Sequence, residues 1–154
     1  MHNLTAIFAR VIIMGMLAAF IASCAGERPN LGVINGTLQP CPASPNCVSS
    51  QATDAGHQIA PLSFSSDPDP AFLLLKQLLS CRRDTKIIVE EVGYLRVEFH
   101  TTFFVDDGEF LLDRNLKAIN VRSASRIGYS DFGKNRSRME EIRREFEAAA
   151  NKRS

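Results

Sequence analysis

The sequence predicts a single α+β domain, in which a four-stranded antiparallel meander is flanked by two helices and preceded by a long Pro- and Ser-rich N-terminal loop. Two observations carry this prediction. Residues 86–123 contain four short β-like segments separated by turn residues. Apolar residues recur at helical spacing before and after this region, and helices placed outside an antiparallel sheet define the α+β class.

The first helix is predicted to begin at residues 67–70, Asp-Pro-Asp-Pro, because Asp caps helices and Pro suits their first turn. Two arginines at residues 82–83 follow the helical run, and cations are favourable at the C-terminal end of a helix. Four apolar residues share one helical face: Phe72, Leu75, Leu78 and Leu79.

The four predicted strands cover residues 86–92, 94–101, 109–113 and 117–123. Gly93 indicates a hairpin between the first two strands. Short polar turns are expected at residues 106–108 and 114–115. The strands alternate apolar and polar residues, so one face of the sheet is expected to be polar. The outward side chains include Arg96, Glu98, His100 and Arg122.

The second helix is predicted to start near Ser137, which has capping-box spacing to Glu140. Two further pairs at one-turn separation, Arg136 with Glu140 and Arg143 with Glu147, would each add a few tenths of a kcal/mol. A narrow apolar stripe faces the sheet: Met139, Ile142, Phe146 and Ala149.

The N-terminal residues resemble a bacterial lipoprotein leader. Arg10 precedes an apolar run, residues 11–22, that would span only roughly 18 Å as a helix, against about 30 Å for a bilayer core. The run ends in Ile-Ala-Ser-Cys, which resembles a lipobox, so Cys24 is expected to carry the lipid after cleavage. Two or more acyl chains anchor a protein stably. The alternative is an uncleaved N-terminal helix with an accidental cysteine.

This leader divides the chain into a signal peptide (residues 1–23), a tether (24–37) and one globular domain (38–154). The resemblance to lipoproteins with a neutral residue after the cysteine, here Ala25, implies an exported protein on the outer membrane that faces the periplasm. Removal of Arg10 with the leader leaves 17 of the 18 basic residues against 17 acidic ones. No basic cluster stands without acids, so we expect no nucleic-acid partner.

Export permits disulfides, and three cysteines besides Cys24 need assignment. Cys41 and Cys47 are separated by five residues that include two prolines, which suits a small closed loop worth roughly 2 kcal/mol. A bridge involving Cys81, or three reduced thiols, are the alternatives. Without a second Cys/His pair the spacing does not suit zinc, and we expect neither a metal nor a cofactor.

Three stretches together resemble one known family. They are residues 41–50 (CPASPNCVSS), 104–110 (FVDDGEF) and 121–136 (VRSASRIGYSDFGKNR). These motifs are similar to those of the bacterial and plastid family called domain of unknown function 1499, and the resemblance covers roughly residue 38 to the last helix, essentially the whole mature domain. It implies an exported or membrane-associated domain with no established activity. Gly108 departs from the pattern, where an apolar residue is expected.

The loop before the last helix is a candidate anion site, because arginine forks and a helix N-terminus both suit carboxylate or phosphate. The candidate residues are Arg122, Arg126 and Arg136. The competing interpretation is that these arginines pair internally with four acids: Asp106, Asp107, Glu109 and Asp131. We therefore expect a lipid-anchored envelope protein that binds a small anionic ligand or another envelope protein and is not an enzyme.

The alternative function is a hydrolytic or thiol-redox enzyme that uses Ser49 or Cys47 with His57, oriented by Asp54. No G-x-S-x-G elbow supports the hydrolase. A redox pair would favour Cys-x-x-Cys at a helix start.

Overall fold

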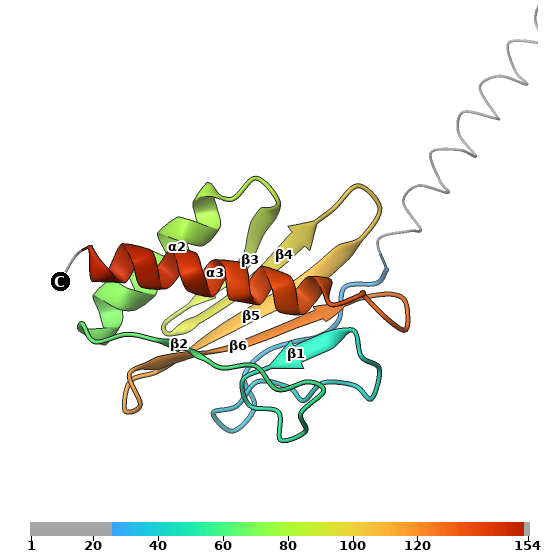
Figure 1. The fold of residues 1–154 in the computed structure, drawn as a ribbon, viewed down its shortest axis with the longest axis horizontal. Helices are drawn as coiled ribbons and strands as arrows, with labels where there is room; N and C mark the ends of the chain where they lie inside the picture. The colour runs from blue at the N-terminus through green and yellow to red at the C-terminus, as the bar shows by residue number, and fades with distance from the viewer. Residues whose placement is uncertain (1–25, 153–154) are drawn as a thin grey trace, which may run out of the picture.

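The computed structural model describes residues 26–152 and confirms the α+β class. In chain order the elements are β1 (Cys47–Ser49), β2 (Leu62–Ser63), α2 (Pro68–Cys81), β3 (Thr85–Glu91), β4 (Tyr94–His100), β5 (Val105–Asp113), β6 (Ala118–Ser125) and α3 (Lys134–Asn151). Both helices lie on one face of a single antiparallel sheet (Figure 1). Cys24 and the whole leader lie outside the described residues.

The sheet has six strands in this part of the chain, where the sequence predicts four. Its order is β1-β6-β5-β4-β3, and β2 pairs with the same edge of β6 as β1, at the start of β6, whereas β1 pairs with its later residues. The two additional strands lie in the stretch expected to be an irregular loop. They are missed because they are only three and two residues long, and all three residues of β1 are buried, so no alternation marks it.

The expected turn at residues 106–108 is wrong, because these residues lie inside β5. The turn between β4 and β5 comes earlier, where the Phe104 amide and the Thr101 hydroxyl hydrogen-bond at 3.0 Å. Two adjacent aspartates can occupy a buried strand here because each faces an arginine. Asp106 pairs with Arg138 of α3 at 2.9 Å, and Asp107 pairs on the opposite face with Arg96 at 3.0 Å.

Helix α3 starts three residues before Ser137, so the expected capping box is also wrong. The amides of Gly133 and Asn135 donate instead to the Asp131 carboxylate, at 3.0 and 2.7 Å. Asp67 occupies the cap position of α2 as expected, but its side chain makes no capping hydrogen bond.

The hydrophobic core lies between the two helices and the sheet. Its fully buried members come from both layers: Leu62, Leu75, Leu79, Leu95, Val97, Phe99, Phe110, Ile119, Val121, Met139 and Phe146. Within the described residues no helix is long and apolar enough to span a membrane.

The opposite face of the sheet is polar, and the N-terminal segment, residues 26–40, contacts it. The Arg28 Nε donates to Glu98 at 2.7 Å, and the Arg96 guanidinium donates to the Pro29 carbonyl at 2.8 Å. The stretch expected to be a tether thus forms part of the molecule's polar side.

Candidate functional site

The antiparallel register brings charged residues into rows across the polar face. Arg96 of β4 lies opposite Glu109 of β5, which in turn lies opposite Arg122 of β6. In the next row Glu98 lies opposite Asp107. Arg126, just beyond β6, reaches back to both of these acids, at 2.5 and 2.7 Å. The two like charges of Glu98 and Asp107 can therefore lie side by side.

The buried carboxylates of Glu98 and Glu109 have pKa values shifted in opposite directions. Burial raises the pKa of Glu109, and the hydrogen bond from Tyr94 at 2.8 Å and the charge of Arg122 only partly offset this. Burial also opposes ionisation of Glu98, but hydrogen bonds from Arg126 and Arg28 outweigh it and lower the pKa of Glu98 to about 2. The hydrogen bond to Asp107 raises the pKa of Arg126 despite its burial. Glu98 is therefore a fixed negative charge at the centre of the network.

A groove of about 440 Å³ runs between this network and the N-terminal segment. Asp107, Arg122 and Arg126 line its sheet side. The other side is formed by Glu27, Pro29 and Leu31, with residues 39–42 at one edge. The predicted disulfide between Cys41 and Cys47 is confirmed, with Cα atoms 5.7 Å apart, and it holds this edge against β1.

Among the buried charged residues that line the groove, Arg122 has the fewest side-chain hydrogen bonds. Its side chain is only 7% exposed, and its one hydrogen bond, to Glu109, is long at 3.3 Å. Three buried arginine Nε atoms in the described chain have no hydrogen-bond partner, those of Arg96, Arg122 and Arg138. Of these three residues only Arg122 lines the groove.

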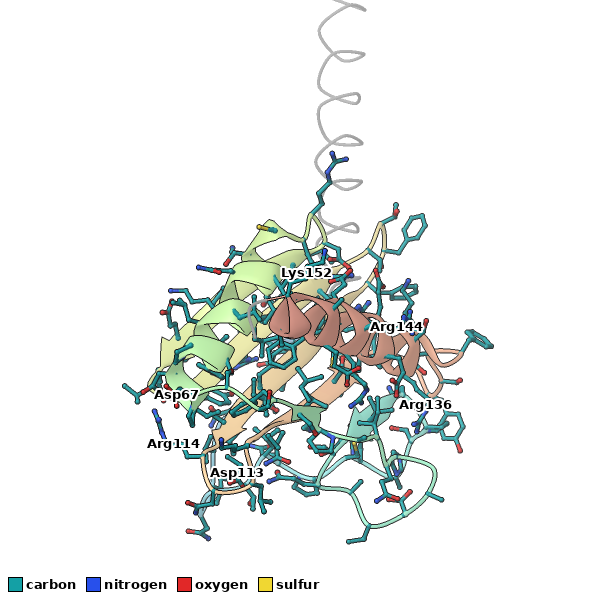
Figure 2. The ribbon with its side chains drawn as sticks, turned by 60° about the vertical axis from the view of Figure 1, so that its left-hand side comes forward. Asp67, Asp113, Arg114, Arg136, Arg144 and Lys152 are labelled. Carbon is teal, nitrogen blue, oxygen red and sulfur yellow. A yellow bond between two sulfur atoms is a disulfide. The ribbon has the colours of Figure 1, made fainter. Side chains whose placement is uncertain are left out.

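Arg136, the third candidate arginine, lies elsewhere. It projects from the start of α3, on the helical side of the sheet (Figure 2), and donates to the carbonyls of Gly56 and Gln58 at 2.8 and 2.7 Å. Asp106 and Asp131 are also outside the groove, since Asp106 faces α3 and Asp131 holds the helix start. The structure thus brings together Arg122, Arg126, Asp107 and Glu109 and separates the other three candidates from them.

The residues of the enzyme alternative are not arranged as a catalytic pair. The His57 ring interacts with Asp54 at 2.8 Å and the Ser44 carbonyl at 3.1 Å, so neither nitrogen contacts Ser49 or Cys47. The buried Ser49 hydroxyl accepts from the Gln51 amide, and Cys47 is in the disulfide. Cys81 is a free, exposed thiol at the end of α2. The described residues contain no cluster of His, Cys, Asp or Glu that could hold a metal ion.

Sequence reasoning did not assign five residues of the charged networks to a site: Arg28, Tyr94, Arg96, Glu98 and Arg138. Pairing the predicted strands in register would have placed Arg96 and Glu98 beside the β5 acids. Nothing in the sequence indicates that Arg138 is buried, with its guanidinium 4.5 Å from the centre of the Phe99 ring. Arg28 was missed because it lies in the expected tether.

These features define a class: a small α+β domain whose polar sheet face is buried by its own N-terminal segment and crossed by arginine–carboxylate pairs. The chain belongs to the family described as "Protein of unknown function (DUF1499)", whose model matches residues 37–146 of the 154. No curated protein and no solved structure matches the chain.

Proposed function

We propose that the protein is an exported, lipid-anchored envelope protein of the outer membrane, attached through Cys24, and that its groove binds a small anion bearing a carboxylate or phosphate. The leader sequence supports the anchor. The Cys41–Cys47 disulfide also supports export, because structural disulfides persist in oxidising compartments.

The anion-binding proposal rests on one observation: Arg122 is a buried residue that lines the groove, and its Nε has no hydrogen-bond partner. A buried N–H without an acceptor is costly, and an anionic oxygen in the groove would supply that acceptor. Arg126 also lines the groove, but it is already paired with two carboxylates, so the bound oxygen would be the acceptor for Arg122. Arginine forks suit carboxylate and phosphate equally, so the chemistry of the ligand is shared between these two groups.

Inorganic phosphate and acetate are the probes for this site. In NMR spectra of the full mature chain that record arginine Nε–H signals, we expect phosphate or acetate to shift the Arg122 signal saturably at constant ionic strength. The Arg138 Nε–H is the internal control, since it is equally unpartnered but lies outside the groove. An R122K variant, which loses the planar fork, should bind about tenfold more weakly, equivalent to about 1.4 kcal/mol. An Arg122 signal that moves no more than that of Arg138 would contradict the proposal.

The anchor is tested separately, by mass spectrometry of the purified membrane-bound protein. We expect a chain that begins at Cys24, with the added mass of its acyl chains and the two-proton deficit of one disulfide. An unmodified chain that retains residues 1–23 would disprove export through this leader.

A further inference from the structure

The exposed aromatic side chains gather on two loops at one end of the molecule. In the described chain the exposed aromatics are Phe103, Phe104, Tyr129 and Phe132, exposed by 70%, 52%, 77% and 97%. The first two lie between β4 and β5, and the others lie between β6 and α3. Exposed apolar side chains are normal when scattered singly, but a cluster indicates an interaction surface.

The two loops form one continuous surface. A cavity of about 190 Å³ lies between them, lined by Phe104 and Val105 from one side and by Ile127, Gly128 and Phe132 from the other. Most of the exposed surface of this cavity is apolar, and the lining also includes the charged residues Asp131 and Lys134. We call this surface the aromatic end, defined by residues 101–105 and 127–132.

The N-terminal segment enters the fold at the same end. A Cβ atom on Gly26 would lie 2.8 Å from both the Arg126 Cβ and the Ile127 Cγ2, so Gly26 packs against the base of the β6–α3 loop. Figure 1 shows the blue start of the described chain beside the β4–β5 and β6–α3 loops. Cys24 is two residues before Gly26, and two residues reach at most about 7 Å.

We propose that the aromatic end docks on the bilayer that holds the acyl chains, so that the domain lies against the membrane with its two aromatic loops in the headgroup region. At this depth Phe and Tyr side chains leave water and contact the boundary between the headgroups and the acyl chains. Aromatic residues are typical of this layer. This inference rests on the proposed lipidation of Cys24. A bilayer is favoured over a protein partner because the acyl chains would be attached within about 7 Å of Gly26, and so beside the aromatic end.

The sequence contains no tryptophan, so the fluorescence of a single introduced tryptophan reports how deeply that residue lies in the bilayer. The test uses the acylated mature chain in phosphatidylethanolamine–phosphatidylglycerol vesicles whose acyl chains carry bromine, which quenches nearby tryptophan. F132W and F103W place the probe at the aromatic end. L116W is the matched control, because Leu116 is 77% exposed on the β5–β6 turn, at the opposite end of the meander. Figure 2 shows Asp113 and Arg114 of that turn far from Arg136 at the start of α3.

We expect contact with the bilayer to blue-shift the emission of F132W and F103W and bromine to quench it, and we expect neither effect in L116W. Equal signals from all three variants would overturn the docking proposal. So would a blue shift of F132W that grows with protein density and is not accompanied by quenching by bromine, because it would show a second copy at the aromatic end. Two further measurements separate the docking proposal from the lipid-anchor proposal: flotation of the protein with the vesicles, and the mass of the chain, which reports acylation. A floating, acylated protein with unquenched F132W disproves docking alone, whereas an unacylated protein disproves the anchor and this inference with it.

Discussion

At the scale of single residues, the protein tolerates buried charge because each charged group lies within reach of an opposite one. Arg138 shows the rule on the helical side of the sheet. Its guanidinium lies over the Phe99 ring, donates to Asn135 at 3.1 Å and pairs with Asp106. Removing one member of such a pair leaves the other charge buried and unpaired, which costs more than the pair contributes. The same reasoning applies to Arg122 and Glu109 on the polar side.

Gly108 gives the first prediction, because the structure leaves no room for a side chain at this position. It lies opposite Val97 in the sheet, and a Cβ atom there would be 2.9 Å from the Val97 Cγ2 and in collision with the Phe99 ring. Both neighbours are fully buried and cannot move aside. We expect G108A to lower the free energy of unfolding by about 1–3 kcal/mol, the usual cost of overpacking.

Urea denaturation measures this change. G56A is the control, since a Cβ on the exposed Gly56 would meet only the Asp54 carboxylate, at 3.3 Å. Its effect should stay within about 0.5 kcal/mol. A G108A protein as stable as the wild type would show that the Phe99 ring does not fill this space.

At the scale of elements, the sequence predicts most helices and strands that show a regular apolar spacing. It does not predict elements whose conformation depends on contacts with residues distant in the sequence. The positions of α2 and of the β3–β4 hairpin follow from apolar spacing and from Gly93, whose φ of 76° suits a tight turn. Residues 106–108 look like a turn because acids and glycine rarely fill strand interiors. They form a strand because arginines on both faces neutralise the acids, which a single stretch of sequence cannot show.

The start of α3 gives the second prediction. Asp131 accepts from two amides there, whereas Ser137, the residue that the capping-box pattern selects, is exposed inside the helix. We expect D131A to lower the free energy of unfolding by about 1 kcal/mol, the usual cost of removing a capping side chain. S137A should be neutral or slightly stabilising, because Ala is the better helix former. Thermal denaturation of the two variants side by side distinguishes them, and equal destabilisation by both would contradict the assignment to Asp131.

At the scale of the whole molecule, the groove depends on three segments that lie far apart in the sequence. Residues 27–31, the loop at Cys41 and the end of β6 meet only because β1 pairs with β6 and the N-terminal segment folds back on the sheet. The sequence indicated Arg122, Arg126 and the disulfide, because charge and cysteine spacing are local. It could not indicate Arg28 or exclude Arg136, because both depend on how distant segments pack.

Glu98 joins these segments and gives the last prediction. Its carboxylate accepts from Arg28 of the N-terminal segment and from Arg126 at the end of β6, and its side chain is 4% exposed. These contacts lower the pKa of Glu98 from 4.5 to about 2. A depressed folded-state pKa contributes stability that is fully present above pH 4.5 and is lost as the pH falls through 2. At about 1.4 kcal/mol per pH unit this contribution is about 3 kcal/mol.

We therefore expect E98Q to lower the free energy of unfolding by up to about 3 kcal/mol at neutral pH, with a difference from the wild type that shrinks between pH 4.5 and 2. E90Q is the matched control, because Glu90 is 52% exposed and its pair with Lys76 lies at the surface, where such pairs contribute about 1 kcal/mol or less. Hydrogen exchange at neutral pH should also show faster exchange in residues 26–40 of E98Q, since Arg28 would lose its partner. Parallel stability curves for E98Q and the wild type across this pH range would mean that Glu98 does not hold the N-terminal segment through its charge.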